Sequence, residues 1–312
     1  MLVMIKSGGA QAMPAWREAF ANALPEADVR CWGDPGVPPE AVRYALVWEP
    51  ERGALARFPN LRMVISTGAG LDHVLADAHY PHGVPLARMI LPETRDGMAE
   101  FVAMGTLMLM RDMGTVARNQ AARRWQTMPF TPLARRTRVG VMGLGALGLH
   151  AARYLAGMGF EVSGWSRSPK SIAGVASYDG MANLPVFLRR ADILVNLLPQ
   201  TADTVGLLNR QRLSMLPRGA RLLNAGRAGH VVHEDLLALL DEGHLGGALL
   251  DVFEAEPLPP GSPLWTHPGV IVTPHCAATP SRADRAHRAA QLIRLAEAGA
   301  PVPDLYEPAR GY

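Results

Sequence analysis

The sequence predicts an α/β protein with two domains, each built on a parallel sheet. Short apolar runs alternate with stretches of helical periodicity along the whole chain, as expected for parallel strands joined by crossover helices. The chain has 312 residues, 48% of them hydrophobic, which suffices for two ordinary cores. A glycine-rich turn near the middle of the chain opens a second series of apolar runs. These three observations together favour two successive α/β domains.

The first third of the chain accounts for one compact domain. Stretches with a helical pattern, such as residues 15–24, separate its apolar runs. The five candidate strands lie at residues 2–6, 28–32, 44–48, 62–66 and 84–88. Such short runs rich in Val, Ile and Tyr and bounded by turn residues are typical of strands.

A long helical stretch from Gly97 to Arg123 follows. Its most apolar part, FVAMGTLMLM at residues 101–110, has about half of the roughly 20 residues that a bilayer requires. We therefore expect a buried helix rather than a membrane span. Its methionine-rich face fits either the protein core or a contact between subunits.

A second series of strands begins after this helix. We expect strands within residues 138–143, 160–165, 192–198, 221–226, 247–252 and 270–275. The segment 280–300 has helical periodicity again, and we expect it to return to the first domain. The predicted domains are therefore residues 1–96 plus 281–312, which is discontinuous, and residues 97–280.

Composition excludes several classes of protein. The balance of 31 basic and 28 acidic residues gives a net charge of only +3, with no long run of one sign, so we expect no nucleic-acid partner. The first residues lack a basic leader and a long apolar segment, so we expect no signal peptide and no membrane contact. Two cysteines, Cys31 and Cys276, make no disulfide framework and favour the cytoplasm. His230, His233 and His244 lack partners at metal-ligand spacing, so we expect no metal.

A glycine motif lies between an apolar strand and an amphipathic helix. Gly143, Gly145 and Gly148 form G-x-G-x-x-G, with Ala146 and Leu147 between the last two. The first glycine permits a tight turn, the second allows a pyrophosphate to approach the backbone, and the third allows close packing of helix and strand. The helix N-terminus then favours a phosphate anion. A purely structural turn is the alternative, but the strand and helix on either side favour dinucleotide binding.

The stretch WSRSPK at residues 165–170 follows the next strand, where the adenosine ribose is expected. A carboxylate there would accept hydrogen bonds from the ribose and repel a 2′-phosphate. Ser166, Arg167, Ser168 and Lys170 instead offer donors and positive charge, which suit a phosphate dianion. We therefore expect NADPH as cofactor, with NADH weaker. The alternative is that Arg167 stacks on adenine or is merely solvated.

Polar residues at the ends of three late strands form a candidate acid–base set. Arg227 follows one strand, Asp251 and Glu256 follow the next, and His275 follows the last. Each alone is weak evidence, because exposed arginines are usually solvated and lone histidines are usually packed rings. Glu254 is a nearby rival to Glu256 and is expected to be a surface acid. In this order after a nucleotide loop, the three types fit one reaction.

Reduction of a 2-oxo acid requires these three types of side chain. An arginine fork can bind the carboxylate and the adjacent carbonyl through parallel charge-assisted hydrogen bonds. A protonated histidine can stabilise the alkoxide that forms on hydride transfer and can deliver its proton. A glutamate bonded to the far ring nitrogen favours the imidazolium and fixes its orientation.

The motifs in this order resemble those of the D-isomer-specific 2-hydroxyacid dehydrogenase family. They are the glycine loop, NAGRAG, DVFEAEPLP and TPHCAA. Further pieces, including YALVWEP, WSRSPK, VNLLPQTADTVGLLN and the terminal ARGY, resemble its glyoxylate/hydroxypyruvate reductase A branch and extend from about residue 44 to the last residue. The resemblance implies two Rossmann-like or flavodoxin-like domains with the active site in the cleft between them. It also implies that Arg227, Glu256 and His275 are catalytic.

The resemblance implies further roles. The loop Gly68, Ala69 and Gly70 would bind the substrate carboxylate through backbone amides, although a simple turn before a helix is the alternative. Leu198 and Pro199, in the LLP motif, would lie along the cofactor, and Asp251 would hold the nicotinamide amide. Trp48 and Arg88 are candidates to line the substrate pocket. Two departures from the family pattern are Ala228 in place of a glycine and Cys276, which we interpret as a small apolar filler.

The predicted function is therefore NADPH-dependent reduction of glyoxylate to glycolate and of hydroxypyruvate to D-glycerate. A homodimer formed through the helix at 97–120 is implied, and whether Trp125 reaches the partner's site is left open. One alternative is a binding protein that senses NAD(P) on the same fold. Another is a family member with a different substrate, such as formate or phosphite; Glu256 argues against formate, and only an assay excludes phosphite.

Overall fold

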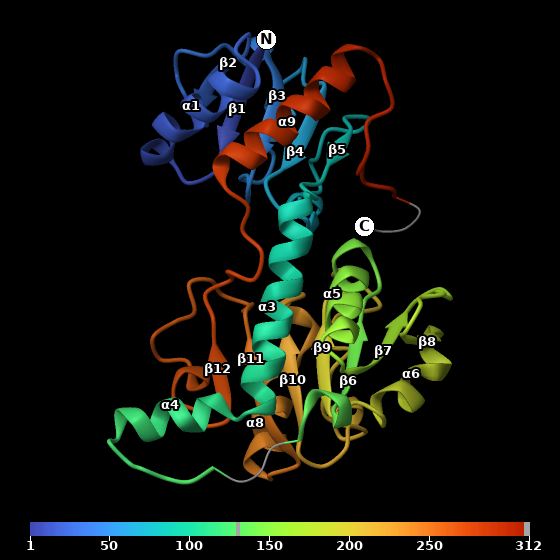
Figure 1. Ribbon diagram of the computed structural model, residues 1–312. Coiled ribbons are helices and arrows are strands. Elements are labelled where there is room, and N and C mark those ends of the chain that lie inside the picture. Colours follow the sequence, from blue (N-terminus) through green and yellow to red (C-terminus); the bar gives the residue numbers. More distant parts are fainter. Residues whose placement is uncertain (129–131, 309–312) are drawn as a thin grey trace. The chain divides into compact units, whose positions relative to one another are not determined.

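The computed structural model describes residues 1–128 and 132–308, which divide into two compact units (Figure 1). Unit 1 comprises Met1–Pro92 and Thr279–Tyr312, and unit 2 comprises Glu93–Ala278. The terminal ARGY motif at 309–312 lies outside the described residues. The roles that the sequence assigns to the two segments, substrate domain and cofactor domain, stay predictions.

Unit 1 contains a five-stranded parallel sheet in the order β2-β1-β3-β4-β5. The strands are β1 (Leu2–Lys6), β2 (Asp28–Cys31), β3 (Val42–Val47), β4 (Met63–Ser66) and β5 (Leu86–Ala87). Its helices are α1 (Met13–Ala23), α2 (Asp72–Leu75) and α9 (Arg282–Glu297). This strand order is that of flavodoxin-like folds.

Both faces of the unit 1 sheet are buried. Along β1, Val3 and Ile5 contact a cluster that contains residues of α1 and α9, whereas Met4 joins a cluster on the opposite face. The same alternation holds in β3, where Tyr44 packs with the helices and Ala45 does not. Figure 1 shows α1 and α9 together with this sheet. The apolar runs of the sequence therefore reflect strands covered on two sides, as parallel sheets require.

Unit 2 contains a seven-stranded parallel sheet in the order β12-β11-β10-β9-β6-β7-β8. The strands are β6 (Arg138–Met142), β7 (Glu161–Ser166), β8 (Ala176–Asp179), β9 (Ile193–Asn196), β10 (Ala220–Asn224), β11 (Leu245–Leu250) and β12 (Val270–Val272). The helices are α3 (Pro92–Met110), α4 (Met113–Ala121), α5 (Ala146–Gly157), α6 (Gly180–Leu188), α7 (Arg210–Leu213) and α8 (His233–Asp241). The order reverses between β6 and β9, as in Rossmann folds. Two parallel-sheet α/β units confirm the predicted fold class.

Helices cover both faces of the unit 2 sheet. The apolar side chains of α3 and α5 pack on one face, and those of α6, α7 and α8 pack on the other. Gly105 lets α3 approach the sheet closely, since a Cβ atom there would lie 2.6 Å from Leu223 Cδ1. The stretch 101–110 is thus a core helix on its sheet-facing side.

Two elements differ from the sequence expectation. The single helix expected at 97–123 is wrong, because the chain turns at Asp112, whose φ is 50°, and then begins α4. Aspartate enters this left-handed region more readily than most residues. Strand β8 was not predicted, since ASYD lacks an apolar run. It pairs only with β7 at the edge of the sheet and is half exposed, so burial leaves no strong pattern in its sequence.

Within residues 1–128 and 132–308, no helix is both long and apolar enough to cross a membrane.

Candidate functional site

The predicted cofactor and catalytic residues of unit 2 lie where its strands end, on the carboxyl-terminal side of the sheet. All seven strands run parallel, so the loops that follow their carboxyl ends emerge together, which is where open α/β sheets bind ligands. The segments at this edge are 143–148 after β6, 166–170 after β7, 197–199 after β9, 225–228 after β10, 251–256 after β11 and 273–277 after β12.

The glycine loop has the geometry that its motif predicts. Gly143 has φ 92°, and a Cβ atom there would lie 2.7 Å from the Leu197 carbonyl oxygen. A Cβ atom on Gly148 would lie only 1.8 Å from the Gly143 carbonyl oxygen. At Gly145, the N-cap of α5, a Cβ atom would meet nothing within 4 Å. The two outer glycines are therefore required for packing, whereas the middle one, followed by Ala146 and Leu147, faces open space. Binding of a diphosphate there stays a prediction.

The turn after β7 presents cations to solvent. Arg167, Ser168 and Lys170 are exposed, whereas Ser166 is buried with 7% of its surface accessible. The Ser166 hydroxyl donates to the Ser168 carbonyl oxygen at 2.8 Å. Ser166 therefore shapes the turn, whereas Arg167, Ser168 and Lys170 are accessible to a ligand. Their contact with a phosphate stays a prediction.

His275 and Glu256 form a direct pair. The Nδ1 atom of His275 lies 2.7 Å from Glu256 Oε2, and both side chains are about one-third exposed. The other carboxylate oxygen of Glu256 accepts the Phe253 N–H at 2.8 Å, which fixes the carboxylate. Glu254 is exposed and makes no hydrogen bond to His275 among the described residues. The pairing leaves His275 Nε2 as the nitrogen that is directed away from the glutamate.

Asp251 organises the segment that carries His275. It is fully buried and accepts three hydrogen bonds, from the Thr273 hydroxyl at 2.6 Å and from the N–H groups of Cys276 and Ala277 at 3.0 Å. Loss of hydration, and next the Asp251 charge, raises the pKa of the Cys276 thiol. A thiol held in its neutral form is a poor nucleophile. Cys276 is exposed, however, so its interpretation from the sequence as a small apolar filler is wrong. The predicted contact of Asp251 with a nicotinamide amide stays a prediction.

A buried network of three polar side chains underlies Arg227. Asn196 donates both of its amide hydrogens, to Asn224 Oδ1 and to His230 Nδ1, each at 2.9 Å. Asn224 in turn donates to the Arg227 carbonyl oxygen at 3.1 Å. Asn196, Asn224 and His230 are fully buried. The Arg227 side chain is partly exposed, and its Nη1 donates to the Gly226 carbonyl oxygen at 2.8 Å.

The same network supports the loop after β9. Asn196 Oδ1 accepts the N–H of Leu198 at 3.3 Å, and Leu198 is buried. Pro199 is exposed, and its carbonyl oxygen accepts the Thr204 hydroxyl at 2.9 Å. The network thus joins the predicted cofactor segment 197–199 to the predicted substrate anchor at Arg227.

Unit 1 contains the predicted substrate-binding residues. Gly68, Ala69 and Gly70 form the loop between β4 and α2, and all three are partly exposed. Trp48 follows β3 and lies against Gly68, where a Cβ atom would come within 2.8 Å of the indole ring. Arg88 follows β5; it is partly buried, and its N–H donates to the Asp304 carbonyl oxygen at 3.1 Å.

Several residues that organise these segments were not predicted from the sequence. They are Ser66, His73, Asn196, Asn224, His230 and Thr273. Ser66, Asn196 and Asn224 end strands and Thr273 follows one, but small polar residues near strand ends are common and do not reveal their partners. His73 lies in α2 and His230 in a short helix, where the sequence offered no signal. In the described part of the chain, no group of three or more His, Cys, Asp and Glu side chains is arranged to hold a metal ion.

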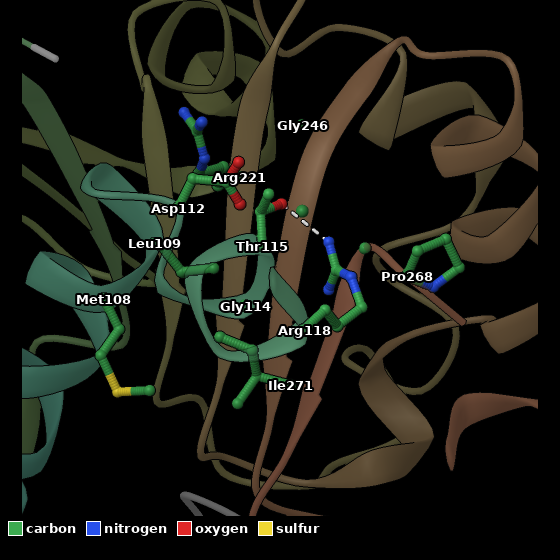
Figure 2. A pocket seen from close by; sticks show the side chains of 12 residues that line it. Met108, Leu109, Asp112, Gly114, Thr115, Arg118, Arg221, Gly246, Pro268 and Ile271 are labelled. Atoms are coloured by element: carbon green, nitrogen blue, oxygen red, sulfur yellow. Dashed lines mark hydrogen bonds between the residues drawn. The ribbon is translucent and has the colours of Figure 1, made fainter. Parts of the chain in front are cut away.

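A cavity of about 220 Å³ lies on the amino-terminal side of the unit 2 sheet, where its strands begin. Its lining includes Arg221, Gly246 and Gly269, near the amino ends of β10, β11 and β12, together with residues of α3 and α4. Figure 2 shows Thr115 and Arg118 in this cavity, with Arg118 donating to the Thr115 hydroxyl at 2.7 Å. Because ligands of open α/β sheets bind at the carboxyl ends of the strands, this cavity is not the predicted catalytic site.

Comparison with known proteins gives consistent matches. Residues 103–277 match the model of the D-isomer specific 2-hydroxyacid dehydrogenase, NAD binding domain. A D-isomer specific 2-hydroxyacid dehydrogenase from Xanthobacter autotrophicus Py2, solved with NADPH and MES, is 44% identical with a TM-score of 0.92. An NADPH-dependent glyoxylate/hydroxypyruvate reductase from Sinorhizobium meliloti, solved with NADP and sulfate, is 39% identical with a TM-score of 0.90. The probable 2-hydroxyacid dehydrogenase of Rhizobium etli CFN 42, solved with NADP, HEPES and L(+)-tartaric acid, is 34% identical with a TM-score of 0.89. Each match covers 100% of this chain and 99% of the other chain.

Proposed function

This chain belongs to the D-isomer-specific 2-hydroxyacid dehydrogenase family, and we propose that it is an NADPH-dependent reductase of small 2-oxo acids. The proposed reactions are glyoxylate to glycolate and hydroxypyruvate to D-glycerate. The observation that carries the proposal is the pair that His275 Nδ1 forms with Glu256 Oε2 at 2.7 Å. This pair lies on the same carboxyl-terminal side of the sheet as Arg227 and the glycine loop. This pair is what proton delivery to a reduced carbonyl requires.

The residues present fit a dinucleotide phosphate. Gly145 offers open space at the N-terminus of α5, and the exposed Arg167 and Lys170 follow β7. Relatives of 44% and 39% identity were solved with NADPH and NADP. When bound, the reduced nicotinamide supplies the hydride. Arg167, Ser168 and Lys170 would hold the 2′-phosphate through charge-assisted hydrogen bonds.

Each of the predicted site residues has a separate proposed role toward the substrate. Arg227 would bind the carboxylate and carbonyl oxygens, and the N–H groups of Ala69 and Gly70 would bind the carboxylate as well. Glu256 holds the imidazole of His275 through Nδ1, so that Nε2 donates a proton to the oxygen as negative charge develops there. Trp48 and Arg88 would border the substrate.

The first experiment is to follow the absorbance of the reduced nicotinamide when purified protein meets glyoxylate or hydroxypyruvate, with NADPH beside NADH. We expect rapid oxidation that favours NADPH, with D-glycerate as the product from hydroxypyruvate. Activity with NADH alone would overturn the phosphate role of the turn after β7. Cofactor binding without turnover of any 2-oxo acid would overturn the reductase and favour a sensor. Formation of NADPH from phosphite would instead identify a different substrate.

We also propose a homodimer formed through the outer face of α3 and the start of α4. Met104, Leu107 and Met113 are 37–43% exposed there, and Trp125 after α4 is 99% exposed. Large apolar side chains gathered on one surface typically mark an interface. Light scattering on the wild-type protein should give twice the chain mass, and Leu107→Asp should shift it to the monomer. A monomeric wild-type protein would contradict this proposal.

We further propose a cytoplasmic location, which is supported by the two cysteines, since both are free in the structure.

A further inference from the structure

The loop between β4 and α2 is held by a small polar network that includes two residues outside every predicted site. Ser66 ends β4 and is fully buried. Its hydroxyl accepts the N–H of Gly68 at 3.1 Å and donates to the carbonyl oxygen of Gly70 at 3.2 Å. The hydroxyl also lies 3.0 Å from His73 Nε2. One side chain therefore bonds to both ends of the glycine loop.

The tautomer of His73 follows from its second contact. The N–H of Glu49 donates to His73 Nδ1 at 3.1 Å, so Nδ1 carries no proton. In the neutral ring, Nε2 then carries the hydrogen and donates to Ser66 Oγ. Ser66 thus makes one donated and two accepted hydrogen bonds, which is the full capacity of a hydroxyl group. The directions of these hydrogen bonds are mutually consistent, and reversing any one of them would break a hydrogen bond.

His73 also links the loop to Trp48. The centroids of the two rings lie 4.4 Å apart and the ring planes are inclined at 41°. The indole also packs against Gly68. On the other side of the loop, the Gly68 carbonyl oxygen accepts the N–H of Met89 at 3.0 Å. Gly68 is therefore fixed through its N–H, its carbonyl oxygen and its contact with the indole.

The network determines which amides remain for a ligand. The N–H of Gly68 is used by Ser66, so it is not part of the anion-binding set. Within residues 1–128 and 132–308, the N–H groups of Ala69 and Gly70 donate no hydrogen bond. Successive backbone N–H groups in a turn can form an anion-binding concavity, which suits a carboxylate.

We propose that Ser66 and His73 are positioning residues, which fix the loop so that the N–H groups of Ala69 and Gly70 bind the carboxylate of the 2-oxo acid. This inference rests on the proposed function. Neither side chain touches the substrate in this scheme. His73 acts through Ser66 and Trp48, and Ser66 acts through Gly68 and Gly70.

The test separates substrate from cofactor parameters. Ser66→Ala and His73→Ala should each raise KM for glyoxylate and hydroxypyruvate by about tenfold, a loss typical of a displaced charge-assisted hydrogen bond. KM for NADPH should stay within about twofold, because the NADPH site is proposed on other residues. His73→Gln, whose amide can still reach Ser66, should recover part of the loss. His82→Ala, at an exposed histidine on the same unit, is the control and should resemble wild type.

A double variant tests the connection between the two residues. Since His73 acts largely through Ser66, the Ser66→Ala/His73→Ala protein should be little worse than Ser66→Ala alone. Additive losses in the double variant would overturn the inference that His73 acts through Ser66. Thermal unfolding of every variant identifies misfolding, and if Ser66→Ala does not fold, His73→Ala beside His73→Gln decides.

Binding of oxalate in the presence of NADPH, measured by calorimetry, requires no turnover. Wild-type binding that weakens about tenfold in His73→Ala supports the inference, in line with the same lost hydrogen bond. Turnover by wild type with unchanged oxalate affinity and KM in folded variants overturns the inference and leaves the proposed function standing. A wild-type protein that neither turns over 2-oxo acids nor binds oxalate overturns both.

Discussion

His275 shows how much of the proposed chemistry depends on individual residues. Its φ of 49° lies in the left-handed region, which is costly for a non-glycine residue. Asp251 offsets this cost by binding the groups on either side of it, at Thr273, Cys276 and Ala277. Glu256 then fixes the ring itself. Backbone and side chain are thus held by two different carboxylates.

Replacing His275 with asparagine should remove the proton donor while keeping the backbone, because asparagine adopts left-handed φ more readily than most residues. We expect kcat for hydroxypyruvate reduction to fall by roughly 10²- to 10⁴-fold, the usual contribution of general acid catalysis. Glu254→Gln, at the exposed neighbouring acid, should leave kcat unchanged. Steady-state kinetics of both variants provides the check, and turnover of the asparagine variant within a few-fold of wild type would contradict the assignment.

The glycine loop offers a matched pair of substitutions. Gly148→Ala places a Cβ atom 1.8 Å from a carbonyl oxygen, so we expect a clearly lower melting temperature. Gly145→Ala meets nothing within 4 Å, so the melting temperature should hold. NADPH affinity should fall, because the methyl group would occupy the space proposed for the diphosphate. Thermal unfolding and NADPH fluorescence titration measure both. Unchanged NADPH affinity in Gly145→Ala would show that the cofactor does not approach this backbone.

Among the structural elements, the turn after β7 is predicted to set cofactor preference. Arg167→Ala removes one charge-assisted bond to a 2′-phosphate, so KM for NADPH should rise by about 10- to 100-fold, whereas KM for NADH should change little. Arg189→Ala, on the turn after α6, is the control. A parallel rise in KM for both cofactors would indicate that Arg167 contacts adenine instead.

The ends of β9 and β10 depend on the buried asparagines. Asn196→Ala would leave Asn224 and His230 without a shared donor in the core, so the free energy of unfolding should fall by about 1–3 kcal/mol. Urea unfolding measures it. Asn183→Ala, at an exposed position whose amide donates to the Asp179 carbonyl oxygen at 2.8 Å, should cost much less, and equal losses would argue against a special role for the network.

The elements also show what sequence can and cannot predict. Strands buried on both faces, such as β9 (ILVN), are visible as continuous apolar runs, and motif order locates Arg227, Glu256 and His275. The edge strand β8 has no such run, and the break at Asp112 depends on one backbone angle. Ser66 and His73 escaped prediction because their importance lies in mutual distance, which the spacing of seven residues does not reveal.

At the scale of the whole molecule, α9 is bonded to residues of its own unit that lie 253 and 235 positions earlier in the chain. The Glu297 carboxylate accepts hydrogen bonds from the Tyr44 hydroxyl and from Arg62, the latter at 2.7 Å. These bonds hold the pKa of Glu297 below its ordinary value of 4.5. Burial, and next Glu297, raises the pKa of Tyr44 to about 12.

These pKa shifts predict a pH dependence of stability. Since the folded-state pKa of Glu297 is lowered, its contribution is fully present above 4.5 and is lost as pH falls through the lowered value. Glu297→Gln should therefore destabilise the protein near neutral pH, by less than about 1 kcal/mol because the carboxylate is partly exposed. The difference from wild type should vanish in acid. Urea unfolding across pH tests this, with Glu18→Gln on the exposed side of α1 as control. A difference that persists at low pH would contradict the charge-based explanation.

The discontinuity of unit 1 has a consequence for how the protein is made. Leu292 and Ile293 of α9 are fully buried in the cluster that contains Trp16 and Phe20 of α1. A nascent chain on the ribosome has synthesised all of unit 2 before it reaches these residues. Unit 2 can therefore fold first. Until α9 is synthesised, the aromatic side chains that it covers in unit 1 stay exposed, and they can bind chaperones or cause aggregation. Completion of unit 1 therefore depends on the synthesis of residues 282–297.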